Sequence, residues 1–410
     1  MRFLEYVNNL LWGPLGSLFI LGGGIYLLIK LKFFYILHPV KTLKSASVGG
    51  GGVSAMLSAL GGSIGVGNIV GVGVALSLGG AGAVFWMWVC ALITAVLKYA
   101  EIYLAVKHKG RANGGPMYYL RLLKIPFLPE IFCALCIISS FGIGCTVQSN
   151  AVALAATPLG ISDVSVGLVL AFFCFVTFIG GGKRLQKVCE FLVPVMSILY
   201  IGCCIVIIAL KVKHFPSMLT NIIKSAFNFK SALGGVGASL FLRGLKEGMS
   251  KGIFSAESGM GSSSIMYSFN CNEKPEKQGV WGVIEVFIDT IVMCSLSAFV
   301  LLLSDKENIF SAFGSFFGKL GGYFTFLSLF CFAYTSICCW NFYGASCIAA
   351  LSKRKWALLI YNALFSLCIY IGAVASTGGV WLISDLCNAL MLFVNFYGII
   401  ALSRRIRSPL

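Results

Sequence analysis

The chain is short of charge, and of acidic groups most of all. Only 11% of its 410 residues are charged, with 14 Asp and Glu together and three His, whereas an average soluble domain has about 25% charged residues. A water-exposed surface cannot be built from so few charges. Hydrophobic residues make up 58% of the chain and the mean hydropathy is +0.92. Apolar runs of the roughly 20 residues that span a bilayer recur from end to end, so the sequence predicts an integral membrane protein.

The groups that an enzyme needs are also missing from the pattern. His38, His108 and His214 all lie at loops or at the ends of apolar runs, away from any base or nucleophile. Most of the 16 Cys lie inside apolar runs, and the one C-x-x-C, Cys133 with Cys136, has no second pair near it. These Cys are expected to be buried apolar side chains rather than metal ligands or redox groups. The sequence therefore predicts no catalytic residues.

Basic residues dominate the few charges that remain. The net charge is +17, from 31 Lys and Arg, a value that suggests nucleic-acid binding in a soluble protein. Here the basic residues lie in short loops between apolar runs, where they orient a membrane protein. No nucleic-acid partner is expected, and the lipid bilayer is the predicted surrounding.

Eleven apolar runs are long enough to be membrane helices. They lie near residues 11–31, 52–79, 82–106, 131–156, 164–180, 188–210, 231–262, 280–303, 320–350, 355–374 and 380–402. The first run has no small-x-small cleavage site, so a retained helix is predicted there rather than a signal peptide.

The distribution of Lys and Arg predicts the orientation. With the N-terminus outside and the C-terminus cytoplasmic, 20 basic residues fall on the cytoplasmic side and seven outside, with four in or beside helices. This imbalance satisfies the positive-inside rule. We therefore expect a multi-pass membrane protein with this orientation.

Eleven helices divide into one extra helix and two sets of five. The extra helix is 11–31, and the two five-helix repeats would be 48–211 and 228–403 in a single transmembrane domain. The second and seventh helices then correspond, and both are rich in Gly. Paired, Gly-interrupted helices are typical of inverted-repeat transporters with binding sites at the interruptions. The break in the seventh helix is open between 234–237 and 244–252.

The segment 61–68, GGSIGVGN, is the strongest candidate for a binding site. Unwinding a helix within the membrane frees N–H groups for a carboxylate and C=O groups for a cation, and Gly makes such unwinding easy. The alternative is close helix packing of the G-x-x-x-G type. Asn68 favours the binding site, because a buried amide needs partners.

Other polar residues inside apolar runs leave alternatives open. Gln148 and Asn150 either join helices or face a substrate. Thr335 and Ser336 either bind a cation or hydrogen-bond back to their own helix. Five carboxylates lie in or at the end of predicted helices, and they are Glu101, Glu257, Glu285, Asp289 and Asp385. Buried carboxylates are functional candidates; Glu285 and Asp289 share a helix face and form either a cation path or structural pairs with Lys98 or Arg243.

The chain resembles the alanine/glycine:cation symporter family, the sodium:alanine symporters. The resemblance covers nearly the whole chain, and the segments that carry it are 62–71 (GSIGVGNIVG), 79–88, 98–101, 114–119, 148–150, 251–261, 278–279, 285–290, 335–344 and 385–395. It implies an all-α membrane protein of the leucine-transporter type, with two inverted five-helix repeats after one extra helix.

The resemblance also implies a function and a set of site residues. It implies secondary active import of small neutral amino acids such as alanine, glycine and D-alanine, coupled to Na⁺. The amides of Val66 and Gly67 would hold the substrate carboxylate with Asn68 beside them, and Gln148 and Trp340 would line the pocket. Na⁺ would be bound by the residues Gly61, Ile64, Thr335 and Ser336.

Four positions depart from the family pattern. The family usually has Thr at Val66, Asn at Ala256, Ala at Ser258 and Glu at Ala345. The alternatives are therefore a transporter of the same fold for another small zwitterion, or coupling to H⁺. A channel would show a selectivity filter, which the sequence does not indicate. The oligomeric state stays open, and a monomer is compatible with the sequence.

Overall fold

Helices form all the regular structure of the described part of the chain. The computed structural model describes every residue except 1, 47–50, 111–112, 228–235, 270 and 376–377. The longer helices are α2 (Pro14–Lys30), α5 (Gly52–Ser63), α7 (Gly82–Lys107), α9 (Leu128–Phe141), α10 (Val147–Ala156), α11 (Asp163–Ile179), α12 (Gly181–Leu210), α14 (Val236–Ala256), α16 (Pro275–Val286), α17 (Ser295–Ser304), α19 (Lys319–Leu351), α20 (Lys355–Val374) and α21 (Gly378–Ala401).

Short elements join or cover these helices. The short α-helices are α1 (Arg2–Leu11), α3 (Phe34–Leu37), α4 (Pro39–Ser45), α6 (Val72–Gly79), α8 (Pro116–Tyr119), α13 (Phe215–Ala226), α15 (Ser262–Ser268) and α18 (Ile309–Phe317). Three π-helical segments are η1 (Gly67–Gly71), η3 (Gly142–Thr146) and η7 (Phe287–Cys294). The 3₁₀ turns are η2 (Leu120–Leu123), η4 (Thr157–Leu159), η5 (Val212–His214) and η8 (Ser403–Arg405).

Every one of the eleven predicted runs contains a helix, but the structure does not establish eleven membrane spans. Among the described residues, seven helices are long and apolar enough to cross a membrane, or eight when the bent pair Gly52–Ser63 and Gly67–Gly79 is taken as one span. The first and fifth runs contain the shorter apolar helices Gly16–Lys30 and Asp163–Ile179. The seventh run contains α14, which carries four charged residues. The count of eleven and the repeat boundaries remain predictions.

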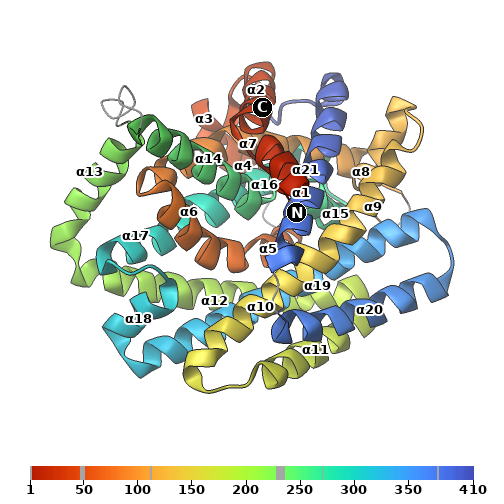
Figure 1. Ribbon diagram of the computed structural model, residues 1–410. Coiled ribbons are helices and arrows are strands. Elements are labelled where there is room, and N and C mark those ends of the chain that lie inside the picture. The colour runs from red at the N-terminus through yellow and green to blue at the C-terminus, as the bar shows by residue number, and fades with distance from the viewer. Residues whose placement is uncertain (1, 47–50, 111–112, 228–235, 270, 376–377) are drawn as a thin grey trace.

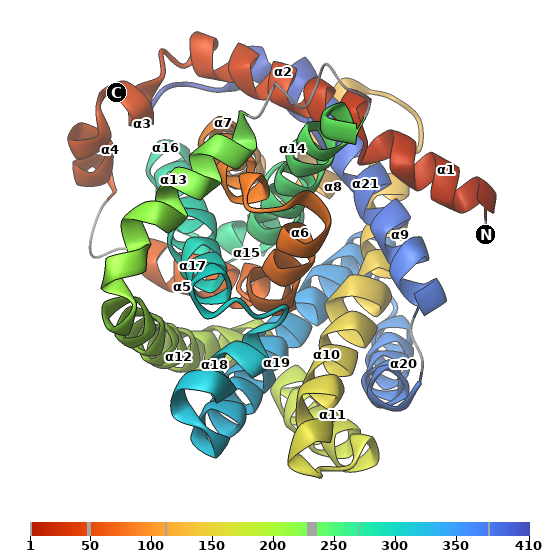
Figure 2. The same cartoon turned by 60° about the vertical axis from the view of Figure 1, so that its left-hand side comes forward.

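The helices form two groups that meet around the middle of the molecule. In one group α7 packs against α14 and α16, with α5, α6 and α17 beside them. In the other, α10 and α11 pack against α19 and α20. Figures 1 and 2 show the two groups from different sides, with α12 and α19 passing along the face of the first group near α5.

Apolar side chains also cover the outside of the molecule. Leu168 and Phe172 on α11, Phe191 and Ile198 on α12, and Leu359 on α20 are between 57% and 72% exposed. Of the apolar stretches of α12 and α20, only 28% is buried inside the protein. An apolar outer surface of this kind is stable in lipid and unstable in water, so the chain is a multi-pass membrane protein.

Two helices are broken where they pass the middle of the molecule. The first break separates α5 from η1 and α6, whose axes differ by 58°. The second follows α14, where the chain turns at 257–261 before α15. Of the two positions considered for a break in the seventh helix, 244–252 is wrong, because α14 is continuous there and the turn comes after it. The other position, 234–237, begins with Gly234 and Gly235, which lie outside the described residues.

The second break is built on left-handed backbone. Gly259 and Gly261 have φ of 82° and 86°, and Glu257 has φ of 49°. Gly adopts this region at no steric penalty, whereas a Glu there is uncommon and strained by about 1 kcal/mol or more. Strained residues of this kind concentrate at functional sites, so Glu257 is a candidate for a functional residue.

Candidate functional site

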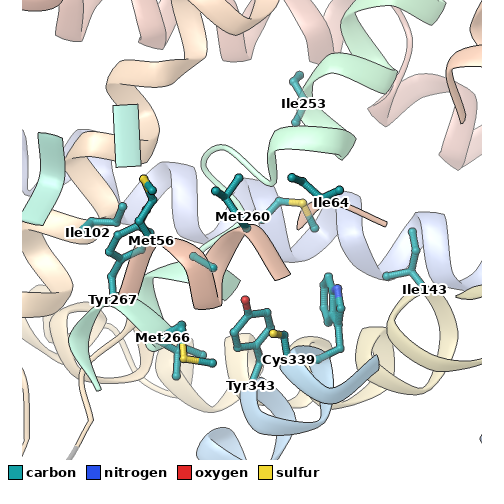
Figure 3. Close-up of a cluster of buried hydrophobic side chains, with 14 of the residues drawn as sticks. Met56, Ile64, Ile102, Ile143, Ile253, Met260, Met266, Tyr267, Cys339 and Tyr343 are labelled. Atoms are coloured by element: carbon teal, nitrogen blue, oxygen red, sulfur yellow. The ribbon is translucent and has the colours of Figure 1, made fainter. Parts of the chain in front are cut away.

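A small enclosed cavity lies between the two breaks. It has a volume of about 20 Å³, which is room for about one water molecule. Its lining comes from five separate parts of the chain, and the residues are Gly62, Ser63, Gly67, Ile143, Gln148, Phe254, Ser255, Glu257, Met260, Trp340 and Asn388. The buried apolar residues around it include Ile64, Ile143 and Met260 (Figure 3). An amino acid enters this cavity only if side chains or helices move apart.

Asn68 holds the first break in shape. Its Oδ1 accepts from the Gly65 amide at 3.1 Å, while its Nδ2 donates to Asp289 Oδ1 and to Ser255 Oγ, each at 2.8 Å. The side chain is fully buried. It therefore replaces the hydrogen bonds that the interrupted helix has lost and ties the break to η7 and α14.

The other end of the same break is held by a second carboxylate. Ser63 Oγ donates to Glu285 Oε1 at 3.2 Å, and Lys98 Nζ lies 3.1 Å from that oxygen. Lys98 also donates to the carbonyl of Ala256 at 2.8 Å, at the end of α14. Glu285 thus pairs with Lys98, one of the two alternatives, whereas Asp289 accepts hydrogen bonds from Asn68 and Ser255.

Gln148 and Ser336 approach the first break from the other helix group. Gln148 Oε1 accepts from the Val66 amide at 3.2 Å, and Ser336 Oγ donates to the Gly62 carbonyl at 2.9 Å. Gly65 lies between them, because a Cβ there would be only 3.0 Å from Gln148 Oε1. The break is therefore the contact point of the two helix groups.

The second break presents a carboxylate to the cavity. Glu257 is 4% exposed, and its Oε2 accepts from Ser262 Oγ at 2.5 Å. The next turn is fixed by Glu101, which accepts from the Gly261 amide at 2.9 Å. The strained backbone of Glu257 is thereby held from α7 and α15.

Among the described residues, two π-helical segments contribute to the cavity lining, and a third contacts the lining residue Ser255. η1 begins at Gly67, η3 contains Ile143, and η7 contains Asp289. A π-helical turn inserts one residue into an α-helix and is frequent at functional sites. The sequence contains no periodic signal that reveals these insertions.

The predicted substrate residues divide into two sets. Gly67, Gln148 and Trp340 line the cavity. Val66 and Asn68 are buried behind it, at 2% and 0% exposed, and the Val66 side chain packs in the apolar core. A hydroxyl at Val66 would therefore face the core in this conformation, and the amide of Val66 is engaged by Gln148. Substrate binding by these five residues stays a prediction.

The predicted sodium residues are brought together only in part. Ser336 reaches the break at Gly62, and Ile64 is fully buried beside it. Thr335 hydrogen-bonds back to the carbonyl of Phe332 at 3.0 Å. The α-carbon of Gly61 faces Cys189, whose Sγ would lie 2.8 Å from a Cβ there. The sodium set stays a prediction.

Several lining residues were not predicted from the sequence. Ser255 and Asn388 are polar residues in or beside apolar runs, and Phe254 and Met260 flank the second break. Polarity inside an apolar run was the available signal for Asn388. The two apolar residues gave no signal, because membrane helices are full of such side chains.

Comparison with known proteins identifies the family of the chain. The sequence model described as the sodium:alanine symporter family matches residues 1–410. The chain is 34% identical to the sodium/alanine symporter AgcS of Methanococcus maripaludis, over 98% of this chain and 95% of the relative. It is 33% identical to the probable sodium/glutamine symporter GlnT of Bacillus subtilis, over 98% and 89% of the two chains.

A third relative differs in the ion that its name gives. The putative sodium/proton-dependent alanine carrier protein YrbD of Bacillus subtilis is 30% identical over 98% of this chain and 90% of its own length. The names of the relatives therefore agree on ion-coupled amino-acid transport and differ in amino acid and ion.

Proposed function

Since the chain belongs to the sodium:alanine symporter family and is a transporter rather than an enzyme, we propose that it imports small neutral amino acids, such as glycine and L- or D-alanine, together with Na⁺. The membrane is the bacterial cytoplasmic membrane, with the N-terminus outside and the C-terminus in the cytoplasm. The positive-inside distribution of Lys and Arg supports this orientation.

The observation that carries the proposal is the pairing of two broken helices across one small cavity that has a carboxylate in its wall. A zwitterion needs a negative partner for its ammonium and N–H donors for its carboxylate. Glu257 at the second break is the partner for the ammonium. The amide at Gly67, where the second half of the broken helix begins, is the donor for the carboxylate, at the positive end of a helix dipole.

The size of the cavity supports a small cargo. Trp340, Phe254 and Met260 occupy much of its wall, so a solute with a long side chain requires larger rearrangement than glycine or alanine.

Na⁺ is cargo in this proposal and binds near the first break. The Ser336 hydroxyl and the Gly62 carbonyl lie 2.9 Å apart, and together with the carbonyls of Gly61 and Ile64 and the hydroxyl of Thr335 they are oxygen ligands of the kind that hard cations prefer. A potential of about 100 mV contributes roughly 2.3 kcal/mol per charge, enough for accumulation by a few tens-fold.

Transport then proceeds by alternating access. The two groups of helices rock against each other around the break, with the cation and the amino acid ordering the same unwound backbone. In this scheme the two inverted repeats are 48–211 and 228–403, and the extra helix 11–31 precedes them in the sequence.

The test is uptake of radiolabelled glycine, L-alanine and D-alanine into proteoliposomes. We expect accumulation with an inward Na⁺ gradient and none with K⁺ in its place. Gly67→Leu is the site variant, because a Cβ at Gly67 already lies 3.4 Å from the Phe254 ring and a longer side chain fills the cavity. It should abolish uptake.

The control is Gly202→Leu, because a Cβ at Gly202 has nothing within 4 Å and the residue is outside the cavity. Uptake equal to wild type is expected there. Wild-type protein that is folded and inserted but accumulates none of the three solutes would refute the proposed cargo.

A second candidate is the same transport driven by H⁺. Glu101, Glu257, Glu285 and Asp289 are all buried, and Glu285 is paired with Lys98, so proton binding is chemically available. An inward pH gradient that drives uptake without Na⁺ would favour it.

A further inference from the structure

Four residues along one face of α21 contact η3, the cavity and the second break. Ser384 packs on η3, since a Cβ at Gly142 would overlap the Ser384 hydroxyl. Leu392 packs on the second break, 3.2 Å from where a Cβ on Gly259 would lie. Asn395 binds the same break through the Gly259 carbonyl at 2.8 Å. Asn388 lies between these contacts on the same helix face and lines the cavity.

Asn388 and Asn395 are the same residue type on the same face of one helix, but their surroundings differ. Asn395 is fully hydrogen-bonded, donating to Gly259 and to Glu101 and accepting from the hydroxyl of Tyr119. Asn388 is 0% exposed, and neither its Nδ2 nor its Oδ1 has a hydrogen-bond partner among the described residues. Asn395 is therefore structural, and Asn388 has no structural bond to explain it.

A buried amide without partners lowers stability, and such groups are kept where they act on something else. A Leu at Asn388, which has the same branched shape and number of side-chain heavy atoms, would avoid the penalty. The amide offers two donors and an acceptor. Those groups match a small zwitterion, since the carbonyl can accept from an ammonium and the amino group can donate to a carboxylate.

We propose that Asn388 hydrogen-bonds the transported amino acid directly, making α21 a wall of the binding site. This inference rests on the proposed function. It adds to the two broken helices a contact from an unbroken helix, which is held to η3 by Ser384 and to the second break by Leu392 and Asn395.

The experiment compares Asn388→Leu with Asn395→Leu in purified full-length protein. Thermal unfolding is measured with and without the solute that the wild type accumulates best among glycine, L-alanine and D-alanine. A bound solute raises the melting temperature in proportion to its affinity. Asn388→Leu should melt at or above the wild-type temperature without solute and lose most of the upward shift with solute. Asn395→Leu should melt lower without solute and keep the shift.

Uptake kinetics give the second measurement. Asn388→Ala should raise KM for the amino acid about tenfold or more, the loss expected for one good hydrogen bond, and leave the Na⁺ concentration for half-maximal uptake within about twofold. An Asn388→Leu protein that melts lower than wild type and keeps its solute shift, or an unchanged KM in Asn388→Ala, overturns the inference while transport itself stands. A wild type that neither binds nor accumulates any of the three solutes refutes the proposed function and this inference with it.

Discussion

Removing one partner of the buried ion pair between Lys98 and Glu285 should be among the most destabilising single changes in the molecule. Both side chains are completely buried, with Nζ and Oε1 3.1 Å apart. Lys98 comes from α7 and Glu285 from α16, and their other partners are Ala256 at the end of α14 and Ser63 at the end of α5. One variant therefore disturbs four helices.

The magnitude follows from burial. Lys98→Met leaves the Glu285 carboxylate with only the Ser63 hydroxyl among the partners described above, and the Ala256 carbonyl with no side-chain donor. Breaking a buried pair in this way costs about 3–5 kcal/mol, because an uncompensated charge stays inside. The double variant Lys98→Met with Glu285→Leu removes both charges, and we expect it to be less destabilised than the sum of the two single variants.

The assay is reversible unfolding in mixed micelles with increasing SDS, followed by tryptophan fluorescence, for the wild type, the two single variants and the double variant. The control is Lys246→Met. Lys246 and Glu247 lie 3.9 Å apart with side chains 31% and 14% exposed, so their attraction is worth roughly 0–1 kcal/mol. Lys98→Met within about 0.5 kcal/mol of wild type, or single effects that simply add, would refute the reasoning.

Three further outcomes are expected. Gly144→Ala places a Cβ 2.3 Å from the Cβ of Trp340. It should therefore displace the indole, destabilise the protein by about 1–3 kcal/mol and reduce uptake. Uptake equal to that of the wild type would show that the position of Trp340 is unimportant. Replacing Thr335 and Ser336 together by Ala should raise the Na⁺ concentration needed for half-maximal uptake. Replacing Ser336 alone should give most of the effect, because Thr335 bonds to its own helix. An unchanged Na⁺ dependence would contradict this. His108 lies just beyond the end of α7, and its pKa is lowered first by partial burial and then by nearby positive charge. The unfolded state therefore takes up the proton more readily, so stability should fall slightly as the pH drops below about 6.5. His108→Gln should flatten that part of a plot of melting temperature against pH.

Much of the fold followed from the sequence because the membrane leaves little choice of structure. A backbone in lipid must satisfy its own hydrogen bonds, so each apolar run had to be helical, and each of the eleven runs contains a helix. The first break was predicted at its correct place because 61–68 combines four Gly with an Asn inside an apolar run.

The second break shows where such reasoning ends. Gly was taken as the mark of unwinding, yet Gly244, Gly248 and Gly252 lie within continuous α14 and allow it to approach α7 closely: a Cβ at Gly248 would be 2.4 Å from the Ala83 carbonyl oxygen. Close packing and unwinding use the same residue type. Only tertiary contacts, such as Glu101 with the Gly261 amide, decide between them.

The roles of polar residues were equally undetermined by the sequence. Asn68 was expected beside the substrate, which stays a prediction, and the sequence did not reveal that its side chain bonds to Asp289 and Ser255. Those partners lie about 190 to 220 positions away along the chain, a distance over which local pattern carries no information. The same holds for Asn388, whose lack of partners is visible only in three dimensions.

The π-helical segment η3 has a consequence for the phase of the helix that contains it. Each residue of an α-helix turns the chain by about 100°, so the extra residue within Gly142–Thr146 sets the rotation of α10 relative to α9. Deleting one residue there would leave both halves helical and apolar, with hydropathy unchanged. It would nevertheless turn Gln148 by about a quarter of a circle away from Val66. The direction in which Gln148 points is thus set by the number of residues in η3, whatever their type. A one-residue deletion there would be more damaging than most substitutions.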